Sequence, residues 1–283
     1  MKRHYESIEV GTERQGKYFE MKTAHFHPVY EIYYLIAGNR KFFIESEIYN
    51  ISKGDMVFVD KNVMHKSTYS SDKENERAFI RFNDNHISRL IEKFGRKEIE
   101  DCFKQKVFSI PMQRREYVGS IMRQLYNEYK NPDDFSYELM ECYLEELLIF
   151  IIRYRKNVSD HLGVSVYNSS QSLNKSDEHI QSAAKYIVDN YNKNITLSEI
   201  ANFVNMSTTY FSKKFKEVTG FGFKEYLLNL RIKKACELLL ETKLSITDIA
   251  YEAGFNDSNY FGDVFKKCKG ISPLQYRKNR ELI

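Results

Sequence analysis

The sequence predicts an α+β protein in which a β-rich N-terminal half is followed by an all-helical C-terminal domain. Three features of the 283 residues indicate this division. Aromatic and β-branched runs fill the first third, helical periodicity begins after residue 111, and an internal repeat occupies the last hundred residues. We therefore expect four segments, at residues 1–110, 111–156, 157–177 and 178–283.

Residues 1–110 are predicted to form short strands separated by turns. Turn residues stand at Gly38–Asn39 and Lys53–Asp55, and the apolar runs between and around them are Tyr30–Ile36, Lys41–Ser46, Met56–Val59 and Ala78–Phe82. Strands at such regular spacing are typical of a small barrel or sandwich.

Residues 111–156 carry the pattern of a helical hairpin. Apolar side chains recur at helical spacing from Arg114 to Tyr129 and from Phe135 to Arg155, with Pro132 between the two stretches. The second helix has more apolar surface than one stripe requires; its predicted stripe is Leu139, Tyr143, Leu147 and Phe150. The stripe packs either on the β domain or on a second copy of the chain, which would make the hairpin a dimerisation element.

Residues 157–177 lose all periodicity and are rich in Ser, Asn and Gln, which predicts a flexible linker. The domain that follows contains a repeat, since residues 197–220 resemble residues 246–270. Each copy has a short amphipathic helix, a turn residue that tolerates left-handed backbone, an N-cap, two inward Phe residues and a closing Gly. These positions are Asn205, Ser207, Phe211, Phe215 and Gly220, matched by Gly254, Asp257, Phe261, Phe265 and Gly270.

Each copy therefore has the parts of a helix-turn-helix. Between them, Phe223–Glu241 is a stretch of 19 residues without Pro or Gly. As a helix it would span about 28 Å, which is close to the roughly 34 Å between major-groove segments on one face of DNA. This match favours DNA as the partner over a helical bundle that binds another protein.

Residues 179–279 resemble the DNA-binding domain of the AraC/XylS family of bacterial transcriptional regulators. The resemblance is most specific over Ile249–Phe261, Phe265–Lys267 and Gly270–Arg277. It implies two helix-turn-helix units joined by a long helix, with double-stranded promoter DNA as the partner.

The early exposed positions of each second helix are the candidate base readers. They are Thr208, Thr209, Ser212 and Lys213 in the first unit and Ser258, Asn259, Gly262 and Asp263 in the second. The family's base contacts fall on Thr209, Ser212 and Lys213. The second unit departs from the family at Gly262 and Asp263, so we expect the first unit to read more bases. Candidate phosphate contacts, each of which could equally be a solvated surface lysine, are Lys214, Lys216, Lys266, Lys267 and Lys269.

The β half contains a cluster of candidate ligands, namely His25, His27, Glu31 and His65. Three imidazoles and a carboxylate suit a divalent metal ion, and strand alternation places Glu31 and Tyr33 on one face. The spacing from His25 to Gly38 resembles the first motif of the cupin family of small β-barrels, whereas Asp60 and Asn62 depart from the second motif. The alternative is a pocket in which these four residues and Tyr33 bind a small organic effector, or simply one another. His4, His86, His161 and His179 are predicted to lie on the surface.

Charge and cysteine usage narrow the class of protein. The net charge of +4 excludes a polybasic protein, although +3 of it falls in residues 177–283, with 16 basic and 13 acidic side chains. There is no signal-like or membrane-spanning run and no C-x-x-C pair, so we expect a cytoplasmic protein with free thiols and no membrane partner.

These observations predict a sequence-specific transcriptional regulator that is not an enzyme, has no resident cofactor and forms a homodimer. The family resemblance further implies a small-molecule effector such as a sugar. It also implies activation of a catabolic or carbohydrate-related operon, with RNA polymerase as a partner. The alternative function is a metal-dependent cupin enzyme fused to a DNA-binding domain.

Overall fold

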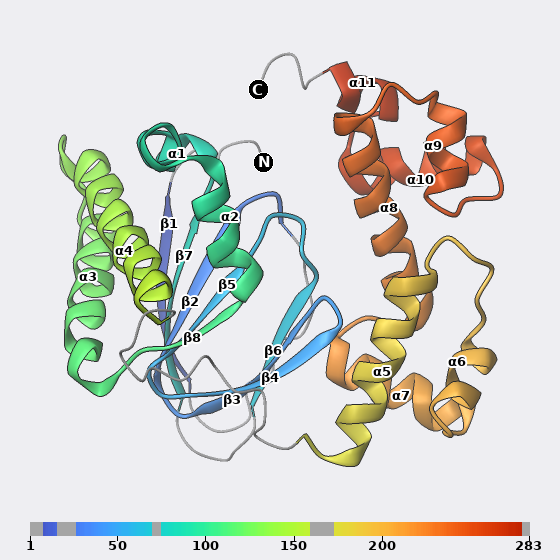
Figure 1. Ribbon diagram of the computed structural model, residues 1–283, viewed down its shortest axis with the longest axis horizontal. Coiled ribbons are helices and arrows are strands. Elements are labelled where there is room, and N and C mark those ends of the chain that lie inside the picture. Colours follow the sequence, from blue (N-terminus) through green and yellow to red (C-terminus); the bar gives the residue numbers. More distant parts are fainter. Residues whose placement is uncertain (1–7, 16–26, 70–74, 159–172, 279–283) are drawn as a thin grey trace. The chain divides into compact units, whose positions relative to one another are not determined.

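The computed structural model describes residues 8–15, 27–69, 75–158 and 173–278 (Figure 1). The chain folds into two compact units. The first comprises residues 1–44 and 49–173, and the second comprises residues 174–283 with residues 45–48. The predicted α+β order, with strands first and a helical domain after them, is confirmed.

The strands form two antiparallel sheets rather than the closed barrel that the cupin resemblance implied. Within the described residues, a five-stranded sheet has the order β1-β7-β2-β5-β8 and a three-stranded sheet has the order β4-β3-β6. The strands are β1 (Glu9–Gln15), β2 (Tyr30–Ala37), β3 (Asn39–Ile44), β4 (Glu47–Ser52), β5 (Asp55–Val59), β6 (His65–Tyr69), β7 (Asn75–Phe82) and β8 (Val107–Ser109). The sequence patterns missed β1, β4, β6 and β8, which are short or rich in polar residues.

Strand β2 separates two layers of the first unit. Tyr33 and Leu35 pack with Phe42 and Ile44 of β3, between the two sheets. The alternate residues Tyr30, Ile32 and Tyr34 face the helices instead. The predicted alternation is thus confirmed, and it places Glu31 in the layer between the sheets.

The described part of the first unit contains five helical segments: η1 (Asp84–Ile87), α1 (Ser88–Phe94), α2 (Arg96–Gln105), α3 (Met112–Lys130) and α4 (Ser136–Val158). The helices α3 and α4 lie side by side (Figure 1). None of the described helices is long and apolar enough to span a membrane. The four cysteines are free thiols, as predicted.

Two predictions for this region need correction. Of the predicted α4 stripe, Leu147 is buried and Tyr143 and Phe150 pack half-buried against the core, but Leu139 is 39% exposed. The buried residues of α4 include Met140, Leu144, Leu147, Leu148 and Ile151. Apolar residues nearly surround this helix, so spacing alone did not identify its inner face. His86 is buried rather than on the surface, because its Nδ1 accepts a hydrogen bond of 3.0 Å from the backbone N–H of Asn83 and closes a capping box on η1.

Between residues 174 and 278 the second unit is helical apart from its turns. Its helices are α5 (Lys175–Asn190), α6 (Leu197–Phe203), α7 (Thr208–Thr219), α8 (Phe223–Glu241), α9 (Ile246–Glu252), α10 (Ser258–Lys269) and α11 (Pro273–Lys278). Helix α5 begins inside the range predicted as a linker, because Asn174 accepts a hydrogen bond from the backbone N–H of Asp177 and caps it. Residues 159–172 of that range lie outside the described residues.

The helix-turn-helix anatomy of both copies is confirmed. Ser207 accepts a hydrogen bond from the backbone N–H of Tyr210 in the first turn of α7, and Asp257 accepts from those of Asn259 and Tyr260 in the first turn of α10. Asn205 and Gly254 have φ angles of 53° and 88° in the two turns. Gly220 and Gly270 close α7 and α10 in left-handed conformations, and α8 has the bounds expected from the sequence.

The turn of the second helix-turn-helix packs against the end of α5. An ideal Cβ on Gly254 would lie 2.7 Å from Cα of Asn192 and 2.9 Å from the carbonyl oxygen of Tyr191. Arg231 of α8 completes this junction, because its Nε donates to the same Tyr191 carbonyl at 2.8 Å. We call these residues the Arg231 junction.

We predict that Gly254→Val destabilises the second unit by roughly 2–4 kcal/mol, since it combines a positive φ with a backbone clash. Chemical denaturation followed by circular dichroism measures the change. Gly262→Ala is the matched control, because a Cβ there meets nothing within 4 Å, and we expect it to be neutral or slightly stabilising in a helix. Equal stability of Gly254→Val and the wild type would contradict the close approach.

Candidate functional site

The exposed face of α7 carries the residues predicted to read DNA. Thr209, Ser212, Lys213 and Lys216 recur at spacings of three and four residues and therefore share one side of the helix. They and Thr208 are exposed, whereas Phe211 and Phe215 are buried on the opposite side. The structure therefore brings the five predicted residues of the first helix-turn-helix onto one solvent-facing surface.

The corresponding face of α10 is less basic. Asn259, Asp263 and Lys266 are exposed, while Ser258 at the helix start is half-buried. Basic residues of α10 are confined to its last turn, at Lys266, Lys267 and Lys269. A carboxylate in the middle of this face would repel phosphates unless it meets a donor such as cytosine N4. The two helix-turn-helix copies thus present differently charged faces to a DNA groove.

The candidate lysines are not equivalent. Lys214 forms an ion pair of 2.7 Å with Glu217, and its side chain is 19% exposed. By contrast, Lys213, Lys216 and Lys266 are exposed and have no ion pair within the described residues. Their ammonium groups are available to an anionic partner.

Sequence reasoning missed an aromatic pair on the same helices. Tyr210 and Tyr260 occupy the third position of α7 and α10, and they are 51% and 58% exposed. Core packing does not explain why large aromatic side chains are exposed at equivalent places in both copies, and these rings are available to a partner. Their recurrence in the repeat was the signal that could have identified them.

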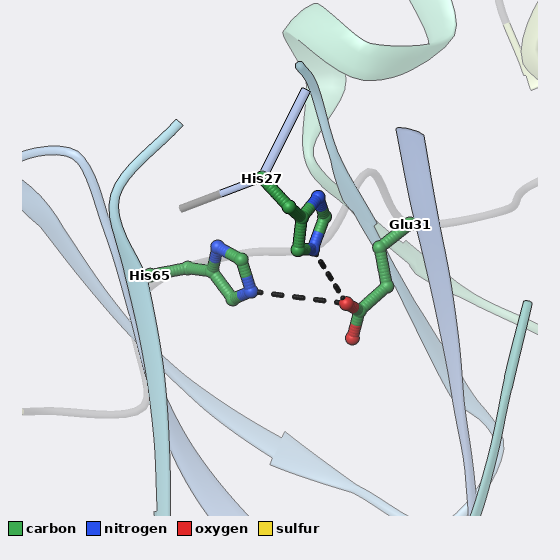
Figure 2. Close-up of side chains that lie close together, drawn as sticks. All are labelled: His27, Glu31 and His65. Carbon is green, nitrogen blue, oxygen red and sulfur yellow. Dashed lines mark hydrogen bonds and ion pairs between the residues drawn. The ribbon is translucent and has the colours of Figure 1, made fainter. Parts of the chain in front are cut away.

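A second set of predicted residues meets in the first unit, between the two sheets (Figure 2). Nε2 of His27 lies 2.9 Å and Nε2 of His65 lies 3.8 Å from the same carboxylate oxygen, Oε2 of Glu31. Their fractional exposures are 5%, 0% and 1%, respectively. We call these three residues the polar centre. His25, the fourth predicted member, lies outside the described residues.

Arg81 of β7 supplies a positive charge to the polar centre. Its Nε donates to Oε2 of Glu31 at 2.9 Å, and its terminal nitrogen lies 3.3 Å from Oε2 of Glu9. Burial by itself would raise the pKa of Glu31, but the hydrogen bond from His27 and the charge of Arg81 outweigh it. The pKa of Glu31 is therefore held well below its usual range.

Tyr33 extends the same buried layer. It is fully buried, and the guanidinium carbons of Arg77 and Arg40 lie 5.3 and 5.8 Å from its ring centroid. Burial raises the pKa of its hydroxyl. Arg77 in turn pairs with Glu13 at 2.8 Å. The layer between the sheets is thus a charged and aromatic interior, not a purely aliphatic one.

The donor set of the polar centre partly fits a metal ion. One ligand atom from each of its three residues lies within 4.8 Å of the others. Nδ1 of His27 and of His65 face the carbonyl oxygens of Val29 and Val63 at 2.8 and 2.9 Å, which is how metal-binding imidazoles are usually oriented. Arg81, however, already donates to Oε2 of Glu31, so a cation bound at that oxygen would lie beside a guanidinium charge.

Comparisons with known proteins identify both units. A family model described as a helix-turn-helix domain matches residues 200–279, and one described as the ExsA N-terminal regulatory domain matches residues 31–159. The Msm operon regulatory protein of Streptococcus mutans is 26% identical over 254 residues, covering 88% of this chain and 84% of the relative. An HTH-type transcriptional regulator of Staphylococcus aureus is 24% identical over 250 residues, covering 88% of this chain but only 31% of that relative.

Among solved structures, the C-terminal domain of a two-component response regulator from Fusobacterium nucleatum is 40% identical; the match covers 37% of this chain and 99% of that one, with a TM-score of 0.34. The repeated units and the sequence matches define a DNA-binding helix-turn-helix transcriptional regulator with an N-terminal regulatory domain. The chain belongs to the AraC/XylS family of transcriptional regulators.

We predict that Arg81→Met destabilises the protein by roughly 2–4 kcal/mol at neutral pH, because it leaves the Glu31 carboxylate buried with less compensation. Since the folded-state pKa of Glu31 is depressed, its contribution to stability is present above about pH 4 and is lost as the pH falls. The gap between wild type and variant should therefore narrow below about pH 4.

Denaturant titrations across this pH range measure that gap. Arg89→Met is the matched control, because the Arg89 side chain is 70% exposed and lies 3.6 Å from its partner Glu145. We expect the control to change stability by less than about 1 kcal/mol. A gap for Arg81→Met that is independent of pH would show that Glu31 is not what Arg81 compensates.

Proposed function

We propose that this protein binds specific promoter sequences as a homodimer and activates transcription there in response to a small molecule. The observation that supports DNA reading most directly is the repeated, capped helix-turn-helix with a basic exposed face on α7. Two such units on one 19-residue helix match two successive turns of the major groove. The site of action is the cytoplasm, where promoter DNA is found.

The first helix-turn-helix is proposed to read bases. The Lys213 ammonium can donate to guanine acceptors, the methyl group of Thr209 can contact thymine, and Ser212 can bond to either kind of base. Five further residues are proposed to contact the DNA backbone or to add weaker base contacts. They are Thr208 and Lys216 of the first helix-turn-helix and Ser258, Asn259 and Lys266 of the second. The second helix-turn-helix then mainly fixes the register of the protein on the duplex.

We predict that Lys213→Ala weakens binding to the preferred operator by about 1–3 kcal/mol and relaxes its sequence preference at one position. The operator is first selected from a random duplex library, and affinities are then measured by fluorescence anisotropy at several salt concentrations. Lys214→Ala is the control, because Lys214 is engaged with Glu217, and it should bind almost normally. An unchanged operator affinity for Lys213→Ala would refute the proposed reading.

Dimerisation is proposed to use the outer face of α4. Leu139 and Cys142 are exposed, and Ile149 is half-buried, on the side of the helix away from Leu144. Tyr117 of α3 borders this face, where its ring lies 5.3 Å from that of Phe150. The same side carries Glu146, which accepts a hydrogen bond of 2.7 Å from the Tyr117 hydroxyl, so the proposed two-fold interface would pair a mixed apolar and polar face with a second copy of itself.

We predict that Leu139→Glu shifts the protein from dimer to monomer, because two buried carboxylates would oppose each other across the interface. Light scattering at several concentrations measures the molar mass. Leu244→Glu, at an equally exposed leucine of the second unit (both 39%), is the control and should leave the mass unchanged. A dimer that survives Leu139→Glu would place the interface elsewhere.

The small-molecule effector is proposed to contact the polar centre and Tyr33. Hydrogen-bonding groups at His27, Glu31 and His65 suit a polyhydroxylated molecule such as a sugar, which would have to replace part of the existing network. The similarity to an operon regulatory protein supports a role in controlling an operon, and we propose that this operon is a catabolic or carbohydrate-related one. Activation would then require contact with RNA polymerase.

The orientation of both imidazoles supports one alternative, a metal-dependent activity in the same unit. A metal at the polar centre would be held by His27, Glu31 and His65 and would supply Lewis-acid chemistry there. Elemental analysis of the purified protein separates the two functions. A stoichiometric metal that is lost in Glu31→Gln would favour the enzyme, and a metal-free protein that still binds its operator would favour the regulator.

A further inference from the structure

A cavity of about 850 Å³ lies on the other side of β2, between the five-stranded sheet and α3. Its floor includes Tyr34 and Ala78 of adjacent strands, and its wall includes Met122 and Tyr126 of α3. Tyr34 and Tyr33 are consecutive residues of β2 and point to opposite faces of the sheet. This space, which we call the hairpin cavity, is therefore separate from the polar centre.

Small residues on facing elements create the hairpin cavity. Thr12, Ala78 and Tyr34 lie in one row across β1, β7 and β2. Opposite this row α3 carries Gly119, where an added Cβ would meet only the terminal nitrogen of Arg123, at 3.3 Å. The hollow is open to solvent at Thr12 and Met112, which are exposed, while Tyr34, Ala78 and Met122 at its base are buried. A recess with an apolar base and polar groups at its rim is suited to a ligand.

The rim of the hairpin cavity is positively charged at one end. Arg115 lies over the turn that carries Lys53, since a Cβ on the adjacent Gly54 would collide with Nε of Arg115. That Nε donates to the carbonyl of Ile110 at 3.0 Å. Lys53 is exposed and has no ion pair within the part of the chain that the structure describes.

The other charges of the lining do not cancel this end. Arg123 is paired with Glu116 at 2.6 Å, which leaves Glu76 as the acid of the lining to be set against Lys53 and Arg115. The buried carboxyl group of Asp55, outside the lining, also interacts with Arg115. Apart from the Arg123–Glu116 pair, the lining thus combines an apolar floor with two cations and one acid. A molecule complementary to it has an apolar body and an anionic head.

We propose that the hairpin cavity binds a small amphipathic organic anion, with its apolar part over Tyr34, Ala78 and Met122 and its acidic group at Lys53 and Arg115. Such a ligand would touch α3 directly. Because α3 packs on α4, it would act on the hairpin without passing through the polar centre. The inference rests on the first unit alone and does not depend on how the second unit reads DNA.

The test uses 8-anilinonaphthalene-1-sulfonate, an aromatic anion whose fluorescence rises on burial, with the full-length protein. We expect saturable binding of one molecule per chain, and binding at least about fivefold weaker for the neutral analogue N-phenyl-1-naphthylamine. Gly119→Leu should fill the cavity and weaken both probes by about tenfold or more. It should not unfold α3, because leucine is the better helix former.

Lys53→Gln, a change at an exposed side chain, should weaken the anion about three- to tenfold and leave the neutral probe unaffected. Lys97→Gln, at another exposed lysine of the same unit, is its control and should change neither. Equal affinity of the two probes, or wild-type anion binding by Lys53→Gln, would overturn the proposed ligand class. Undiminished binding of both probes to a folded Gly119→Leu would overturn the site itself, and near-ultraviolet circular dichroism verifies the fold.

Discussion

The spacing of the two recognition helices depends on how α8 is anchored at the Arg231 junction. The last carbonyl groups at the end of a helix lack partners within it. At the end of α5, Nε of Arg231 donates to the carbonyl of the C-cap residue Tyr191 at 2.8 Å, and a terminal nitrogen donates to the carbonyl of Lys193 in the turn that follows at 2.9 Å. A cation at this position also interacts favourably with the negative end of the α5 dipole.

The same contact decides where the second helix-turn-helix can lie. The guanidinium carbon of Arg231 is 6.0 Å from the ring centroid of Phe255, and the neighbouring Gly254 approaches the backbone of Asn192. The first helix-turn-helix is tied to α8 by Phe215, whose ring centroid lies 5.3 Å from that of Tyr226. Both helix-turn-helix copies are thereby held to one rigid helix, so their separation is fixed before DNA binds. Such preorganisation lowers the entropic cost of binding.

The Glu31 carboxylate has a comparable role in the first unit. It lies on β2 of the five-stranded sheet, and His65 lies on β6 of the three-stranded sheet, so their approach links the two layers. An unpaired buried carboxylate would be costly, which is why Arg81 and His27 both donate to it. A polar interaction that must be satisfied can fix how two sheets face each other, whereas aliphatic contacts alone permit several registers.

The sequence predicted the second unit far better than the first, and the residues explain why. Ser207, Asp257, Gly220 and Gly270 act on backbone groups within a few positions, so their chemistry is visible in the local sequence. Strand β6, by contrast, has the polar sequence His-Lys-Ser-Thr-Tyr and is held by its pairing with β3, a relation that no local pattern contains. Arg81 was missed as a partner of Glu31 for the same reason, since 50 residues separate them.

Strand β2 is the structural element through which the two candidate ligand sites can be related. Glu31 and Tyr33 face the polar centre, while Tyr34 faces the hairpin cavity, and β2 is hydrogen-bonded on both sides to β5 and β7. A strand held on both edges moves with its sheet, so a ligand on one side can change the other only by shifting the whole sheet against α3. Coupling then requires that the ligand bind the two positions of the sheet with different affinity. A ligand in the proposed hairpin cavity would contact both moving surfaces, so its own contacts would differ between the two positions, whereas a ligand at the polar centre would act on α3 only through the sheet.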